Sequence, residues 1–144
     1  MSQQRFVFNA AVSLLIIKAG KVLLTRRSNT GWEDGKYALV GGHIEDNETV
    51  FDTAVREAEE EVGITLNLKY LKVVHTMHDS KYNYIGFFLI ATKWKGKPII
   101  KENDKIDDIS WFPLNHLPSN IPAQNMQGLN GYLRKIQFSE FKYM

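Results

Sequence analysis

The chain has 144 residues, a size that fits one domain, and its 44% hydrophobic and 24% charged residues are typical of a folded globular protein. We therefore predict a single domain over residues 1–144. The net charge of +2 is too small to favour a nucleic-acid or membrane partner, and the absence of cysteine excludes disulfides and thiolate metal sites. No apolar run could span a bilayer and residues 1–5 lack a signal-peptide pattern, so we expect a cytoplasmic protein.

The first part of the chain has the pattern of β-structure interrupted by one loop. Apolar residues over 6–17 and 22–25, separated by a turn at Gly20, predict a β-hairpin. Residues 28–36 are polar and glycine-rich, so we expect a loop there. A short strand is expected over residues 37–40 and should stop at the Gly41–Gly42 pair.

The clearest helix follows this segment. Thr49 and Asp52 have the spacing of a capping box, and Gly63 is expected to end the helix. At about 100° per residue, one apolar face collects the residues expected to enter the core: Phe51, Ala54, Val55, Ala58 and Val62.

Beyond the helix we predict strands over 68–75 and 84–94, a turn at 95–98, a loop over 101–108, a strand over 109–112 and a helix over 127–138. Strands that precede and follow a helix in this way indicate an α+β fold, with a mixed β-sheet sandwiched between helices.

Half of the acidic residues lie in residues 45–61, which carry a local charge of −7 against +9 for the rest of the chain. Within this segment Glu57, Glu60 and Glu61 share one helix face, where without neutralising partners they repel each other. A bound Mg²⁺ would remove this repulsion, because it prefers carboxylate oxygens. A solvated acidic helix is the simpler alternative.

The residues of this region also form a recognisable motif. Gly42, Glu48 and the run Arg56-Glu57-Ala58-Glu59-Glu60-Glu61-Val62-Gly63-Ile64 have the spacing of the Nudix box, so the chain resembles the Nudix hydrolases. Similarity to a bacterial, nucleoside-triphosphate-type branch of the family extends to most of the chain. Val40 stands where many members have proline, which leaves the backbone before the helix less rigid without removing a reacting group.

The resemblance implies a Nudix fold and the hydrolysis of a diphosphate linkage with Mg²⁺, or alternatively Mn²⁺, as cofactor. It implies catalytic roles for Arg56, Glu57, Glu60 and Glu61, and metal ligation by the Gly41 carbonyl, Glu57, Glu60 and Glu61. Glu57 is the first candidate for the general base. Structural roles in the motif are implied for Gly42, for Gly63 and for Glu48, which would pair with Arg56.

A further metal carboxylate is expected from a distal loop, with Glu102 as the first candidate and Asp104 as the second. A polar surface loop explains this segment equally well.

Three residues are weaker candidates for substrate binding. Arg26, in the Arg26–Arg27 pair, could bind phosphates or be a surface charge, and Trp32 lies in a polar loop near the glycine pair. Asn125 could pair with a base, although it or Gln124 could instead cap the last helix, which is the interpretation we favour.

The leading hypothesis is a Mg²⁺-dependent pyrophosphohydrolase acting on a nucleoside triphosphate or another nucleoside diphosphate derivative, as a monomer or homodimer. The alternative is a non-catalytic nucleotide- or metal-binding sensor on the same fold. Action on RNA is the third hypothesis, although the chain lacks an extended basic tail.

Overall fold

The computed structural model describes residues 4–142, so residues 1–3 of the segment examined for a signal peptide lie outside it. An eight-stranded mixed sheet has the order β10-β6-β7-β1-β2-β3, with β4 paired to β1 and β9 paired to β2. Its strands are β1 (Asn9–Lys18), β2 (Lys21–Arg27), β3 (Tyr37–Ala38), β4 (Val40–His43), β6 (Leu71–Asp79), β7 (Tyr84–Ala91), β9 (Ile106–Pro113) and β10 (Phe138–Glu140). A second sheet contains only β5 (Thr65–Leu66) and β8 (Trp94–Lys95).

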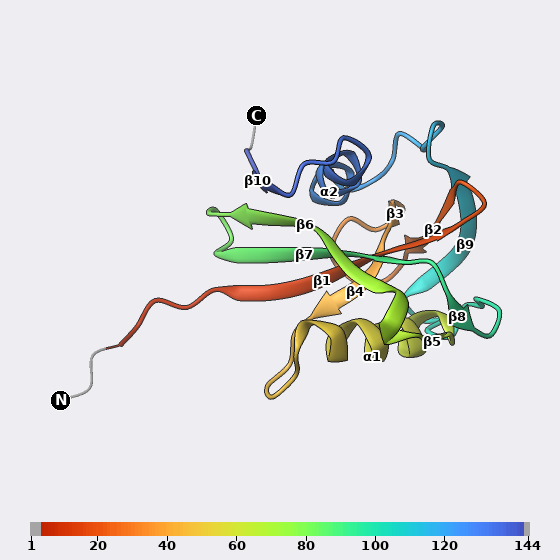
Figure 1. Ribbon diagram of the computed structural model, residues 1–144, viewed down its shortest axis with the longest axis horizontal. Coiled ribbons are helices and arrows are strands. Elements are labelled where there is room, and N and C mark those ends of the chain that lie inside the picture. Colours follow the sequence, from red (N-terminus) through yellow and green to blue (C-terminus); the bar gives the residue numbers. More distant parts are fainter. Residues whose placement is uncertain (1–3, 143–144) are drawn as a thin grey trace.

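Two helices cover the two faces of the large sheet (Figure 1). The apolar face of α1 (Val50–Val62) packs against alternate residues of β1 such as Leu14, and α2 (Ala123–Leu133) packs on the opposite face around Phe88. The predicted α+β fold with a mixed sheet between helices is therefore confirmed. Within residues 4–142, no helix has the length and apolar character needed to cross a membrane.

The glycine pair lies inside strand β4 rather than after the strand, which corrects the predicted strand end. β4 runs antiparallel to β1, with Ser13 opposite Gly41 and Val12 opposite Gly42. A Cβ at Gly41 would lie 2.0 Å from the carbonyl oxygen of Val12, so only glycine allows this pairing. A Cβ at Gly42 would lie 2.3 Å from a carboxylate oxygen of Glu57, so this glycine lets α1 approach the strand.

The hairpin and the first helix agree with the sequence. Ala19 and Gly20 have positive φ angles in the turn between β1 and β2. Thr49 and Asp52 form both hydrogen bonds of the capping box, and Gly63 ends α1 in the left-handed conformation with φ 69°. Local chemistry at the ends of α1 therefore determines where this helix begins and ends.

Several other boundaries differ from the prediction. Residues 68–70 form a 3₁₀ helix (Leu68–Tyr70) before β6, and β9 begins at Ile106, inside the predicted loop. The second helix begins at Ala123 and ends at Leu133, both before the predicted bounds of 127 and 138, and Phe138 begins β10 instead of ending the helix. The reason is tertiary: β10 pairs in parallel with β6, so the sheet provides backbone hydrogen bonds that the end of a helix would leave unmade.

Gly128→Ala should lower the free energy of unfolding by about 1–3 kcal/mol, because a Cβ there would lie 2.0 Å from Cε1 of the fully buried Phe88 ring. Urea denaturation measures this change. Phe88→Leu makes room for the methyl group, so the cost of Gly128→Ala should be smaller in that background. An equal cost in both backgrounds would exclude overpacking as the cause.

Candidate active site

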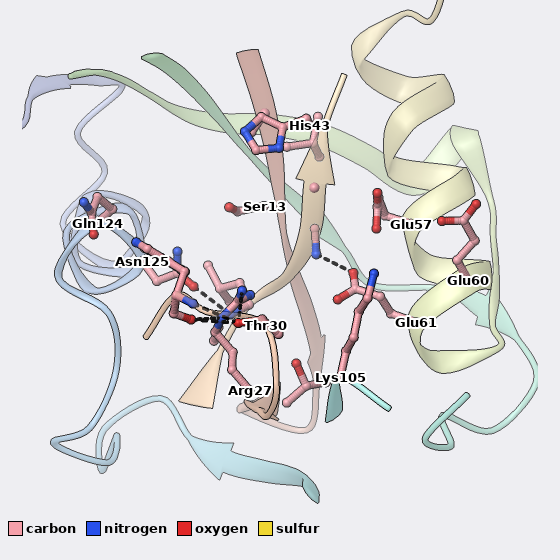
Figure 2. Close-up of a pocket in the computed structure, with 18 of the residues that line it drawn as sticks. Ser13, Arg27, Thr30, His43, Glu57, Glu60, Glu61, Lys105, Gln124 and Asn125 are labelled. Carbon is pink, nitrogen blue, oxygen red and sulfur yellow. Dashed lines mark hydrogen bonds between the residues drawn. The ribbon is translucent and has the colours of Figure 1, made fainter. Parts of the chain in front are cut away.

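A cleft of about 980 Å³ opens beside strands β1 and β4. Its walls come from α1, from the loop over residues 28–36, from the loop before β9 and from the start of α2. Figure 2 shows Glu57, Glu60 and Glu61 on one side of β4 and Arg27, Thr30 and Asn125 on the other. The cleft therefore brings together residues that are up to a hundred positions apart in the sequence.

Two of the α1 carboxylates lie directly against the glycine pair. Glu61 Oε2 accepts a hydrogen bond from the Gly41 backbone nitrogen at 2.8 Å, and the Glu57 carboxylate occupies the space that a side chain at residue 42 would need. Glu60 directly precedes Glu61 in the helix, and it is exposed. The helix thus presents two largely buried carboxylates and one exposed carboxylate to the cleft.

Burial and neighbouring negative charges raise the pKa values of Glu57 and Glu61. Burial raises the pKa of Glu57, and the neighbouring Arg56 only partly offsets this. The pKa of Glu61 lies well above its usual value because of burial first and then the negative charges of Glu57 and Glu102. A cation at this position would offset both effects, since it would favour the ionised carboxylates.

Arg56 is the local counter-ion of the acidic segment. Its Nε donates to Glu48 Oε2 at 2.7 Å and its Nη2 donates to Glu48 Oε1 at 3.0 Å. Its Nη1 contacts Glu57 at 2.8 Å and Glu60 at 3.2 Å. The predicted pairing of Glu48 with Arg56 is therefore present, and Glu57 and Glu60 have a neutralising partner that the sequence did not assign to them.

The distal loop reaches the end of α1 through backbone hydrogen bonds. The backbone nitrogens of Ile99 and Lys101 donate to the carbonyl oxygens of Val62 and Glu61, which are left free at the C-terminal end of the helix. This attachment places Glu102 in the cleft wall, close enough to raise the pKa of Glu61. Asp104, the second candidate from sequence, is exposed and does not line the cleft.

The acidic residues of the cleft fit a hard divalent cation, because Glu57, Glu60, Glu61 and Glu102 all line it and such a cation prefers carboxylate oxygens. Within residues 4–142, however, no group of three or more His, Asp or Glu side chains is arranged to hold a metal ion. Arg56 accounts for part of this arrangement, because its Nη1 already contacts oxygens of Glu57 and Glu60. Each of these contacts uses one carboxylate oxygen, so the second oxygen of Glu57 and of Glu60 stays available to a cation while Arg56 holds the first.

The α2 side of the cleft contributes the amide side chains of Gln124 and Asn125. Asn125 is buried, and its Oδ1 accepts a hydrogen bond from the Leu39 backbone nitrogen at 2.8 Å. Pro122 is the N-cap of α2, without a side-chain capping bond, so the capping role favoured for Asn125 or Gln124 is wrong. The Asn125 side chain instead fixes α2 to the segment that enters β4.

Of the two neighbouring arginines, Arg27 lines the cleft and Arg26 does not. Arg26 forms a 2.7 Å ion pair with Asp107 outside the cleft lining. Arg27 lies against the ring of Trp32, with its guanidinium carbon 4.8 Å from the ring centroid. Trp32 also lines the cleft and is 44% exposed.

Several residues that line the cleft were not predicted from sequence, and three of them carry polar groups on different elements. Ser13 lies on β1, Tyr84 begins β7, and Lys105 lies in the loop before β9. Burial, followed by the charge of Asp79, raises the pKa of Tyr84 to about 12, so its hydroxyl remains a hydrogen-bond donor at neutral pH. Strand alternation places Ser13 on the cleft side, but the sequence alone does not show that β1 and β7 are parallel neighbours.

Comparison with known proteins identifies the family of the chain. The NUDIX domain model matches residues 7–131, so the chain belongs to the Nudix family. It is similar to the MutT NUDIX hydrolase from Burkholderia pseudomallei, with a TM-score of 0.76 and 26% identity over 85% of this chain and 95% of that chain. The predicted family is therefore confirmed.

Two relatives of the chain are hydrolases named for different substrates. The chain is 34% identical to the ADP-ribose pyrophosphatase of Methanocaldococcus jannaschii over 75% of its length and 63% of that protein. It is 31% identical to the NAD-capped RNA hydrolase NudC of Pseudomonas aeruginosa over 77% of its length and 38% of that protein. The chain thus spans less than two thirds of either relative.

Glu48→Gln should destabilise the protein in a pH-dependent way. Hydrogen bonds, of which those from Arg56 contribute most, lower the pKa of Glu48 from 4.5 to about 2. The stability contributed by the ionised carboxylate is fully present above the unfolded-state pKa and is lost as the pH falls through the folded-state value. Urea denaturation should therefore show a wild-type advantage that is constant above pH 5 and shrinks toward pH 2.

Glu59→Gln is the matched control, because Glu59 is an exposed glutamate of the same helix that does not line the cleft. A difference between wild type and Glu48→Gln that grew on acidification would contradict this account of the Glu48–Arg56 contact.

Proposed function

We propose that the protein is a divalent-metal-dependent Nudix pyrophosphohydrolase. Its substrate is a nucleoside triphosphate or another nucleoside diphosphate derivative. The observation that carries the proposal is the arrangement of the cleft: the α1 carboxylates Glu57, Glu60 and Glu61 form one wall, and Arg27 lies on the opposite side of β4. Such a cleft can hold a cation and a diphosphate side by side.

In the proposed reaction, water attacks one phosphorus of the diphosphate linkage, and the bond from that phosphorus to the bridging oxygen breaks. Glu57 accepts a proton from the attacking water, and its raised pKa suits this role. Two phosphate-terminated products leave, one of them a nucleoside monophosphate or its equivalent. Arg56 orients Glu57 and Glu60 while its contacts with Glu48 hold the preceding loop.

Mg²⁺ is the proposed cofactor, with Mn²⁺ as the alternative; when bound, it supplies a water of lowered pKa and neutralises charge on the phosphoryl group. Glu57, Glu60, Glu61 and Glu102, with the Gly41 carbonyl, are the residues that would hold it. The raised pKa of Glu61 supports this proposal, because it reflects a concentration of buried negative charge that a cation would relieve.

The α2 side of the cleft is proposed to receive the nucleoside. Asn125 uses its Oδ1 for the Leu39 backbone nitrogen, which leaves its amide Nδ2 as a donor for a base or sugar. Tyr84 adds a hydroxyl donor, and Trp32 offers an exposed ring at the edge of the cleft. We assign the phosphate-binding role to Arg27 rather than to Arg26, because only Arg27 lines the cleft.

Glu57→Gln and Glu60→Gln should each lower kcat by about 10²–10⁴-fold, because a carboxylate that takes a proton or holds the metal is replaced by a neutral amide. The measurement is product release from a panel of nucleoside triphosphates, ADP-ribose, NAD and NAD-capped RNA, resolved by chromatography. Glu59→Gln, outside the cleft on the same helix, should keep wild-type turnover. Normal activity in both cleft variants, or substrate binding without turnover by the wild type, would contradict the proposed function.

Removing divalent metal with a chelator should abolish turnover, and adding Mg²⁺ should raise the unfolding temperature of the wild type. A ligand that binds only the folded state stabilises it by about 2.7 kcal/mol at a hundred times its Kd. Glu61→Gln should lose most of this Mg²⁺-dependent shift, because Glu61 lies where carboxylates and the Gly41 backbone meet. An unchanged shift in the variant would exclude Glu61 as a ligand.

A further inference from the structure

The loop over residues 28–36 is organised by one hydroxyl group and one carboxylate. Thr30 Oγ1 donates to Asp34 Oδ1 at 2.5 Å, and the same carboxylate accepts hydrogen bonds from the backbone nitrogens of Thr30 at 3.1 Å and Gly31 at 2.9 Å. These bonds lower the pKa of Asp34, so the carboxylate remains ionised at neutral pH. The Thr30 hydroxyl has only one proton and two acceptors within reach: Asp34 Oδ1 at 2.5 Å and the Trp32 carbonyl oxygen at 3.0 Å. The contact to Asp34 is shorter and its acceptor is charged, so it is the stronger hydrogen bond and holds the proton.

Because its proton is committed to Asp34, the Thr30 oxygen can accept hydrogen bonds from the cleft side. Arg27 Nη2 donates to it at 2.8 Å, and the Trp32 backbone nitrogen donates at 3.2 Å. Arg27 Nε also donates to the Trp32 carbonyl oxygen at 2.6 Å, and its guanidinium lies over the indole ring. The loop therefore holds the guanidinium by two hydrogen bonds and a ring contact.

This arrangement leaves part of Arg27 available to a ligand. Neither hydrogen bond uses Nη1, and Nη1 donates to no residue within 4–142. An arginine side chain has many rotamers, so one that is already held loses less freedom when an anion binds. Arg26, the neighbouring residue, forms its ion pair with Asp107 instead and is not connected to this network.

We propose that Thr30 and Asp34 are positioning residues for substrate binding: through the Thr30 hydroxyl they hold Arg27 so that Nη1 faces the diphosphate of the substrate. That the bound anion is a diphosphate rests on the proposed function. Asp34 fixes the direction of the Thr30 hydroxyl, and Thr30 fixes the guanidinium. Figure 2 shows Arg27 and Thr30 across β4 from the α1 carboxylates, which is where the guanidinium would contact the phosphate oxygens.

The test is a double-mutant cycle between Thr30 and Arg27. Thr30→Val removes the hydroxyl at nearly constant shape and should raise KM about tenfold with kcat within a factor of about two, which is the effect expected from losing a hydrogen bond to a charged group. Thr30→Ser keeps the hydroxyl and should restore a KM close to that of the wild type. In an Arg27→Ala background, Thr30→Val should cause no further loss, because the residue through which it acts is gone.

Two further variants separate positioning from loop stability. Asp34→Asn should raise KM as Thr30→Val does. The amide of asparagine can donate a hydrogen bond to the Thr30 oxygen, and the Thr30 hydroxyl proton would then no longer be directed at residue 34. Asp107→Asn breaks the Arg26 ion pair next to this network and should leave KM unchanged. Equal effects of Thr30→Val and Thr30→Ser, or a full Thr30→Val effect in the Arg27→Ala background, would overturn the proposal.

Direct binding distinguishes failure of this inference from failure of the proposed function. If the wild type hydrolyses nothing in the substrate panel, the hydrolase proposal fails, and the cycle is repeated by calorimetry with ADP and with inorganic pyrophosphate. The positioning role would be supported if the variants changed Kd in the way that is expected for KM. The positioning role would be overturned if the wild type bound neither ADP nor pyrophosphate. It would also be overturned if the wild type and Thr30→Val bound both anions with the same Kd.

Discussion

The guanidinium of Arg56 is the contact on which the acidic side of the cleft depends. All four ion pairs described for the acids of residues 45–61 are made by this one side chain. Its bidentate contact with Glu48 attaches the loop before α1 to the middle of the helix, while its Nη1 restrains Glu57 and Glu60. The same cation therefore stabilises the local fold and keeps repelling carboxylates together.

The second constraint is the close approach of backbone to carboxylate at β4. Glycine at residue 41 lets β4 pair with β1, and glycine at residue 42 leaves room for the Glu57 carboxylate. Both effects bring charged oxygens next to the main chain, where burial raises their pKa. Stability alone would not favour this placement, since buried carboxylates are costly unless a cation or hydrogen-bond donor is present. Such local conflicts are expected where a site serves function.

Local signals in the sequence predicted the parts of the structure that local chemistry controls. The capping box at Thr49, the left-handed stop at Gly63 and the turn at Gly20 depend on neighbouring residues, and each occurs as predicted. The prediction was wrong for α2 and for Asn125, because the end of α2 depends on β10 pairing with β6 and the role of Asn125 depends on the distant Leu39 backbone. The motif predicted that Glu57, Glu60 and Glu61 lie together and that Arg56 pairs with Glu48, but it did not predict that Arg56 also contacts Glu57 and Glu60.

The two sides of the cleft have opposite charge, and this has a consequence for the proposed reaction. Without a cation, the α1 wall repels a diphosphate, while Arg27 on the other side attracts it. A divalent ion at the proposed site would offset much of the negative charge of the first wall, so that the wall would repel the substrate less. Binding of cation and diphosphate should accordingly be cooperative, and linkage requires each to increase the affinity of the other by the same factor. Arg27, held in advance by Thr30, provides the part of this attraction that does not depend on the metal.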